Sequence, residues 1–270
     1  MWTAKIFTLY PELFPGPFNY GLYKKALEKN IWSLEIYNIR DGATDKHKTV
    51  DDTPFGGGSG MILKPEVLEN SLNKYVKQDE KIVYLSPKGK KLSQEMAKSF
   101  LKEKITNIIC GHFEGVDQRI LETRNIEEIS IGDFVLSGGE TAAYVFIDVI
   151  VRLLPEVLGN DQSTLEESFE NNLLEYPQYT KPQKWESKCV PDVLLSGDHA
   201  KIKDWRLSQS EAITRRRRPD LWEKYKKNKK KTLDYSRLVC ILWGVCKNQQ
   251  EELATLTSRV TTLEANKRNA

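Results

Sequence analysis

Residues 1–160 alternate short apolar runs with amphipathic segments, and this alternation restricts the possible folds more than any other feature of the chain. Apolar runs typical of strands occupy residues 4–9, 32–37, 81–86, 105–111 and 129–137, and helix-like segments occupy residues 21–29, 65–76, 93–103 and 139–154. Strands that alternate with helices are typical of a parallel sheet covered by helices. The sequence therefore predicts an α/β domain with a largely parallel sheet over residues 1–160.

The remainder of the chain has a different character. Residues 161–178 are polar and acidic, which predicts a flexible linker or an active-site loop. Residues 179–270 are basic and helical in pattern, with Ser196, Gly197 and Asp198 as candidate helix N-caps and Pro219 at a helix boundary. From about residue 239 to residue 263, apolar side chains recur at alternating spacings of three and four. This heptad pattern indicates either a short oligomerising coiled coil or the packed face of a terminal helix, and the sequence leaves both open.

Composition and spacing exclude several classes of protein. No run approaches the roughly 18 apolar residues of a membrane span, and we expect no signal peptide at the N-terminus. The four cysteines are widely separated and form no CxxC pair, which argues against a zinc cluster and against a disulfide framework. We therefore expect a cytoplasmic protein without membrane contact.

Basic residues concentrate in one part of the chain. Residues 198–235 contain 13 Lys and Arg against 6 Asp and Glu, whereas the whole chain has a net charge of only +3. Trp205, Trp222 and Tyr225 are interleaved with the basic clusters. A basic stripe with aromatic residues suits a phosphate backbone and stacked bases. A solvated helix face would have the same composition, so charge alone does not decide between the two.

Glycine-rich segments follow three of the predicted strands. They occupy residues 86–89, 111–115 and 131–140, and a fourth, at 55–60, lies in a polar loop. None has the spacing of a dinucleotide-binding loop or of a P-loop. Ligands of open α/β sheets bind outside the carboxyl ends of the strands, where glycines let the backbone come close. Together, the three loops predict a ligand pocket at that edge of the sheet.

Several longer segments resemble one known family. They are VDDTPFGGGSGM, YLSPKG, CGHFEGVDQR, SIGDFVLSGGE and VLLSGDHAKIKDWRLSQS, in this order. With them, the chain resembles the bacterial tRNA (guanine-N1)-methyltransferases of the knotted SPOUT class over about residues 1–221. The resemblance implies a trefoil-knotted domain that binds S-adenosylmethionine, a smaller all-helical domain that binds tRNA, and a homodimer with active sites at the subunit interface. The implied methyl acceptor is N1 of the guanine at position 37 of tRNA, 3′ of the anticodon.

The resemblance also implies roles for particular residues. It places the S-adenosylmethionine pocket at Ser86, Pro87, Gly111, Phe113, Glu114, Gly115, Ile131, Gly132, Phe134, Leu136, Gly138 and Gly139. The residues it implies for tRNA binding are Phe55, Gly57 and Gly58, and with them we expect His47, Arg215 and Arg216 to contact tRNA. The family is described as magnesium-dependent, and the sequence shows no site for that ion.

Three residues are implied in catalysis. The position of the family's general base falls at Glu167, which Ser168 follows, and Glu166 is an adjacent alternative. Guanine N1 is a poor nucleophile until its proton leaves, and a carboxylate within hydrogen-bond reach can take that proton. The negative charge that then develops on O6 suits a fixed guanidinium, which the resemblance places at Arg152.

The chain departs from the family's pattern at several of these positions. Glu167 stands where an aspartate is usual, His112 replaces an arginine, and Phe113 and Phe134 replace tyrosines. The tail from about residue 232 matches nothing in the family. Two alternatives therefore stay open: a non-catalytic RNA-binding homologue that has lost its base, and a small-molecule enzyme whose basic surface is incidental.

Overall fold

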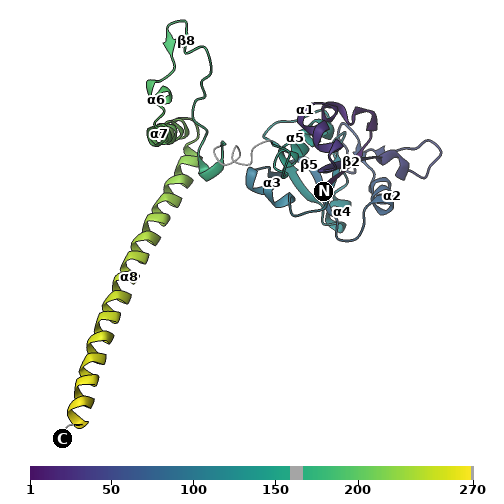
Figure 1. Ribbon diagram of the computed structural model, residues 1–270. Helices are drawn as coiled ribbons and strands as arrows, with labels where there is room; N and C mark the ends of the chain where they lie inside the picture. The colour runs from purple at the N-terminus through teal and green to yellow at the C-terminus, as the bar shows by residue number, and fades with distance from the viewer. Residues whose placement is uncertain (159–166, 269–270) are drawn as a thin grey trace. The chain divides into compact units, whose positions relative to one another are not determined.

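The computed structural model describes residues 1–158 and 167–268, of which residues 170, 231–238, 241 and 262–268 are described by their backbone only. The chain divides into two compact units, Met1–Thr164 and Leu165–Ala270, and each is described by itself (Figure 1). Part of the predicted linker, residues 161–166, lies outside the described residues, and Glu166 lies there too.

The first unit is built on a five-stranded sheet. Its strands, in spatial order, are β2 (Trp32–Asn38), β1 (Trp2–Thr8), β6 (Ile105–Cys110), β5 (Lys81–Lys91) and β7 (Glu127–Ser130). All neighbouring pairs are parallel, which confirms the predicted parallel sheet. A separate two-stranded ladder joins β3 (Asp51–Asp52) to β4 (Ile62–Leu63), one on each side of the glycine-rich segment 55–60.

Helices cover both faces of the sheet. One apolar cluster packs α1 (Gly21–Glu28), α3 (Gln94–Phe100) and α5 (Gly139–Val151) against one face, and a second packs α2 (Pro65–Tyr75) and α4 (Gln118–Thr123) against the other. Short 3-10 helices complete the unit at Pro11–Leu13, Gly16–Asn19 and Ile39–Gly42. Because both faces are covered, every residue of β1 is buried, as expected for a central parallel strand.

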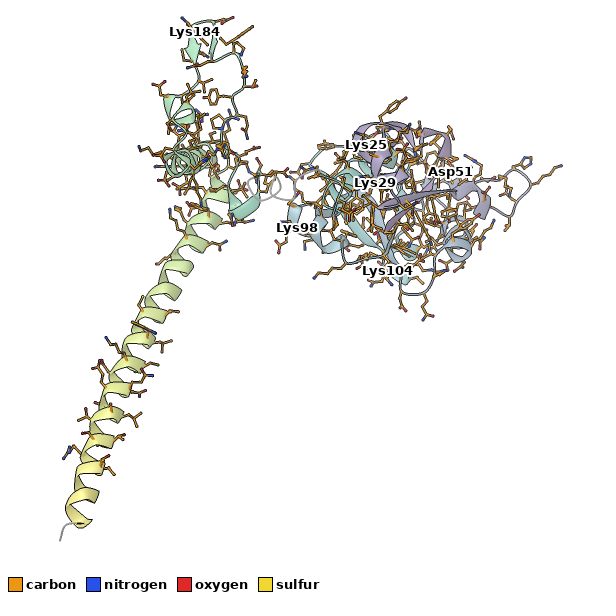
Figure 2. All side chains as sticks on the ribbon, in the orientation of Figure 1. Lys25, Lys29, Asp51, Lys98, Lys104 and Lys184 are labelled. Carbon is orange, nitrogen blue, oxygen red and sulfur yellow. The ribbon has the colours of Figure 1, made fainter. Side chains whose placement is uncertain are left out.

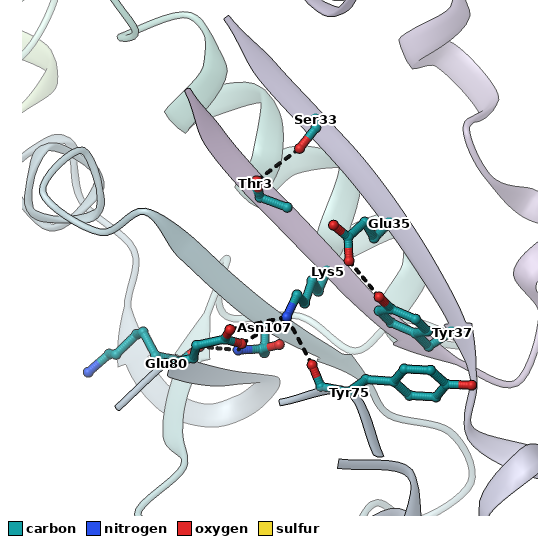
Figure 3. Close-up of polar contacts among 9 residues, drawn as sticks. Thr3, Lys5, Ser33, Glu35, Tyr37, Tyr75, Glu80 and Asn107 are labelled. Atoms are coloured by element: carbon teal, nitrogen blue, oxygen red, sulfur yellow. Dashed lines mark hydrogen bonds and ion pairs between the residues drawn. The ribbon is translucent and has the colours of Figure 1, made fainter. Parts of the chain in front are cut away.

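One charged residue lies inside this sheet. The side chain of Lys5 on β1 is only 7% exposed, and its Nζ donates to the Glu80 carboxylate at 3.0 Å and to the Tyr75 carbonyl at 2.9 Å (Figure 3). Asn107 donates to the same carboxylate at 3.1 Å. Burial alone would raise the pKa of Glu80, but the hydrogen bonds from Asn107 and Lys5 lower it below its usual value. The buried charge is therefore paired, as a buried charge must be.

The second unit combines helices with one short hairpin. Its elements are a 3-10 helix (Glu170–Asn172), β8 (Lys184–Trp185), β9 (Lys188–Cys189), α6 (Asp192–Leu195), α7 (His199–Arg217) and α8 (Pro219–Arg268). The expectation of an all-helical domain is wrong here, because β8 and β9 pair antiparallel across a tight turn at Glu186, whose φ is 53°. Lys184 marks this hairpin in Figure 2.

Two predicted helix boundaries are confirmed in this unit. The Asp198 side chain accepts a hydrogen bond from the backbone N–H of Lys201 at 3.1 Å and caps α7. Pro219 begins α8, where its missing N–H costs no helical hydrogen bond. In the part of the chain that the structure describes, no helix is long and apolar enough to cross a membrane.

Candidate functional site

Three loops at the carboxyl ends of β5, β6 and β7 surround one cavity of about 260 Å³. These are the loops whose glycines predicted a ligand pocket. The cavity is lined by all twelve residues assigned to the methyl donor, namely Ser86, Pro87, Gly111, Phe113, Glu114, Gly115, Ile131, Gly132, Phe134, Leu136, Gly138 and Gly139. Residues that were not assigned to the methyl donor also line it, among them Tyr84, His112 and Glu128.

The first loop is a bulge in β5. Leu85 and Lys90 both pair with Ile129 of β7, so residues 86–89 leave the ladder, and Ser86, Pro87 and Lys88 line the cavity. A Cβ on Gly89 would lie 2.3 Å from the backbone nitrogen of Ile129, so a side chain there would push the two strands apart. Within the bulge, the Ser86 hydroxyl accepts a hydrogen bond from the backbone N–H of Lys88 at 3.2 Å.

The second loop follows β6 and turns sharply. Phe113 has a φ of 59°, a left-handed conformation that is costly for an aromatic residue, and its side chain is half-exposed. The backbone N–H of Gly115 donates to the His112 carbonyl at 3.1 Å and closes the turn. Below the turn, burial and the nearby charge of Glu128 raise the pKa of Tyr84 to about 12. The Tyr84 hydroxyl therefore stays protonated at neutral pH.

The third loop runs from β7 to α5 and presents apolar side chains. Phe134, Val135 and Leu136 are all exposed, Val135 to 86%. The backbone N–H of Gly139, at the start of α5, donates to the Gly111 carbonyl at 2.9 Å, so the third loop is fixed to the second. Such an exposed apolar group at the mouth of a cavity is typical of a binding surface.

A polar network supports the pocket from behind. The His112 ring lies 2.8 Å from the buried Glu140 carboxylate, which also accepts a hydrogen bond from the Thr8 hydroxyl. The Tyr10 ring packs edge-on against His112 at 4.8 Å. Sequence analysis missed Glu140 and Thr8. One feature of the sequence could have indicated Glu140. It lies in the first turn of a helix that begins at Gly138 and Gly139, and an acidic residue is favoured in the first turn of a helix.

We expect Gly139→Ala to damage the pocket. The new Cβ would lie 2.6 Å from the Cα of Cys110 and 2.6 Å from the nitrogen of Gly111, which are backbone atoms that cannot rotate away. Overpacking of this kind costs about 1–3 kcal/mol of unfolding free energy, and we expect at least a roughly ten-fold loss of S-adenosylmethionine affinity. Calorimetric titration and thermal unfolding measure both quantities.

Gly132→Ala is the matched control for stability. Its Cβ would meet the Phe134 ring at 2.3 Å, but that ring is a half-exposed side chain that can turn. We therefore expect a clearly smaller fall in the melting temperature than for Gly139→Ala. Equal falls in melting temperature would contradict our explanation that residue 139 must be glycine because α5 approaches β6 closely.

The residues predicted to meet tRNA lie in two places. Phe55, Gly57 and Gly58 lie in the loop between β3 and β4, where Phe55 is fully exposed and both glycines have positive φ. His47 is exposed nearby in the same unit. Arg215 and Arg216 are exposed in the last turn of α7, in the second unit.

The predicted catalytic residues are divided between the units. Arg152 is the C-cap of α5 in the first unit, and its backbone N–H donates to the Asp148 carbonyl at 3.1 Å. Glu167 and Ser168 are half-buried at the start of the described part of the second unit. The Ser168 hydroxyl accepts a hydrogen bond from the backbone N–H of Glu175 at 3.1 Å, which orders this segment locally.

Metal-ligating side chains do not cluster in the described residues. Over residues 1–158 and 167–268, no group of three or more His, Cys, Asp or Glu residues could hold a metal ion. The four cysteines are all reduced: Cys110 is buried, and Cys189, Cys240 and Cys246 are exposed.

Over most of its length, the chain is similar to known proteins. The family described as tRNA (Guanine-1)-methyltransferase TrmD matches residues 1–224. A tRNA (guanine-N(1)-)-methyltransferase of Pelagibacter ubique (strain HTCC1062) is 71% identical over 228 residues, which are 84% of this chain and 100% of that protein. An enzyme of the same name from Brucella canis is 53% identical over 228 residues, which are 84% of this chain and 93% of that protein.

Proposed function

The chain belongs to the tRNA (guanine-1)-methyltransferase family, and we propose that its three-loop cavity holds S-adenosylmethionine while N1 of guanine 37 of a tRNA receives the methyl group. The protein is an enzyme that transfers a methyl group from S-adenosylmethionine to N1 of a guanine in tRNA. The observation that carries the assignment of the site is the convergence of three loops, far apart in sequence, on one cavity.

The residues of the cavity fit this methyl donor. Gly111 and Gly138 leave space that a side chain would fill. A Cβ on Gly111 would lie 2.6 Å from the Tyr84 ring, and a Cβ on Gly138 would lie 2.5 Å from the His112 ring. Glu128 lines the cavity, and its Oε2 atom is buried without a hydrogen-bond partner among the described residues. A buried carboxylate oxygen of this kind attracts a hydrogen-bond donor or a positive charge, and S-adenosylmethionine carries both.

The chain's own residues have to position the reactants. When bound, S-adenosylmethionine supplies a methyl group on a positively charged sulfur, so the protein needs no group to activate it. The rigid turns at Gly115 and Gly139 hold the cavity in one shape, which favours in-line transfer. The apolar side chains of Phe134 and Leu136 line the mouth of the cavity and suit the flat face of a purine.

We assign the removal of the guanine proton to Glu167. Its carboxylate takes the N1 proton, and Arg152 stabilises the negative charge that develops on O6. Ser168 keeps the segment in place through its hydrogen bond with Glu175. The described residues offer no cluster of side chains that fits a magnesium ion.

Three broader expectations belong to the same proposal. A trefoil knot is supported by the path of residues 131–138, which leave edge strand β7 and cross the end of β5 to reach β6. A homodimer with active sites at the interface is supported by the exposed side chains of Phe113, Phe134 and Val135. A cytoplasmic location is supported by the proposed tRNA substrate.

Mass mapping of the methylated nucleoside tests the proposed function. We expect the purified enzyme, with S-adenosylmethionine, to convert guanine 37 of an unmodified tRNA transcript to 1-methylguanine. A transcript with adenine at that position is the matched control and should stay unmethylated. Cofactor binding without any methylation would favour a non-catalytic RNA-binding homologue and would overturn the proposal.

Arg215 and Arg216 are expected to bind tRNA through its phosphates. Replacing both with alanine should weaken tRNA binding and lower the slope of log K against log salt by about 1.5 to 2, because two phosphate contacts are lost. The affinity for S-adenosylmethionine should not change. The control is Lys25→Ala with Lys29→Ala, two exposed cations in α1 and at its C-cap (Figure 2). An equal loss of slope in the control would refute a specific role for the α7 arginines.

A further inference from the structure

The C-terminal half of α8 presents apolar side chains to solvent. Leu242, Leu253, Leu256 and Val260 are all more than half exposed, and Trp243 is 73% exposed. Figure 1 shows why: α8 leaves the region of α6, α7 and the hairpin and continues as a single helix. Within the described residues, Leu221 is the only large apolar side chain of α8 that is buried. An isolated helix with an apolar stripe gains stability when a second helix covers that stripe.

The stripe has the pattern of a two-stranded coiled coil. The a positions are Val239, Cys246, Leu253 and Val260, and the d positions are Leu242, Gln249, Leu256 and Leu263. β-Branched residues at a, together with leucine at d, favour parallel dimers over larger assemblies. We infer that residues 239–263 form a parallel, in-register coiled coil with the same segment of a second copy of this chain.

The polar residue in the stripe favours the parallel arrangement. In a parallel, in-register pair, Gln249 at d faces Gln249 of the second copy, and the two amides can bond to each other. In an antiparallel pair whose register matches Leu253 with Leu256, Gln249 would face Val260, which offers no hydrogen bond. One polar layer of this kind fixes register at a cost in stability.

Charges beside the stripe are compatible with the same arrangement. Arg259 at g would face Glu264 at e of the second copy, and Glu252 at g would face the neutral Thr257. The basic stretch 226–231 ends eight residues before Val239, which is about 12 Å along a helix. The charges of that stretch therefore lie outside the segment 239–263 that forms the coiled coil.

The coiled coil is separate from the methyltransferase site. The family match ends at residue 224, and the whole of the Pelagibacter ubique protein aligns with 228 residues of this chain. The segment 239–263 lies beyond the family match. The inference therefore does not rest on the proposed function, and either can fail without the other.

Cysteine oxidation in the full chain tests the inference. We use a Cys189→Ser background, because the exposed cysteines are then Cys240 and Cys246. Cys246 is at a and meets its counterpart only in a parallel, in-register pair, whereas Cys240 is at b and faces outward. With diamide as oxidant, we expect a covalent dimer on a non-reducing gel. Adding Cys246→Ser should lower its yield about ten-fold, and adding Cys240→Ser should leave it unchanged.

A second pair of variants tests whether the apolar stripe holds the two copies together. Leu253→Lys places a charge at a and should abolish the cross-link, whereas Ala254→Lys, at the outward b position, should keep it. The inference is overturned by no covalent dimer on oxidation, by a dimer that needs Cys240, or by equal cross-linking in both lysine variants. Methylation of tRNA is measured on the same samples, so a failure of the coiled coil is distinguished from a failure of the enzyme.

Discussion

Methyl transfer by the Glu167→Gln variant is expected to fall about 10²–10⁴-fold, while the affinity for S-adenosylmethionine stays the same. Glutamine has nearly the shape of glutamate but cannot accept the proton of guanine N1. Without that proton transfer, N1 remains a poor nucleophile however well the reactants are placed. Single-turnover methylation with saturating tRNA measures the chemical step, and calorimetric titration measures cofactor binding.

Two further variants make this result specific. Glu175→Gln removes a second carboxylate from the same segment, where it accepts a hydrogen bond from Gln178, and it should leave the rate unchanged. Glu167→Asp restores the family's usual residue and should keep most of the activity, if the segment moves by the length of one methylene. A Glu167→Gln enzyme with full activity would move the base to Glu166, the adjacent acid.

The sequence predicted the pocket because its signal is local. A glycine-rich turn directly after an apolar strand can be read without knowing what surrounds it, and the parallel topology then places such turns at one edge of the sheet. Glycines at 111, 132 and 139 were found in this way. The fold class of the first unit followed from the same alternation of strands and helices.

The features that the sequence did not predict depend on distant partners. Lys5 occurs in an otherwise apolar strand, and only the approach of Glu80 explains its burial. The pairing of His112 with Glu140 joins residues on different elements. The β8–β9 hairpin has only two residues in each strand, too few for a periodic signal. Tertiary contacts override local patterns in the first two cases, whereas the hairpin is local but too short to be recognised.

Arg152→Ala is expected to lower the rate of methyl transfer about 10²–10³-fold, with little change in the binding of S-adenosylmethionine. A guanidinium near O6 acts mainly on the charge that develops in the transition state, so its loss lowers the rate constant more than the affinity. In the structure, Arg152 lies close to a hydrogen-bonded pair at the end of α5. Its charge opposes the rise in the pKa of Tyr23, to about 12, that burial and the hydrogen bond to Asp148 produce.

A purely structural role for Arg152 leads to a different result. As the C-cap of α5, its charge would stabilise the end of the helix by about 0.3–1 kcal/mol, so alanine would lower the melting temperature slightly and leave the rate intact. Arg152→Lys separates the two roles, because lysine keeps the charge at the helix end but lacks the planar, two-pronged guanidinium. If Arg152 stabilises O6, the lysine variant keeps the melting temperature of the unsubstituted enzyme and loses most of its rate. If it only caps the helix, the lysine variant keeps both.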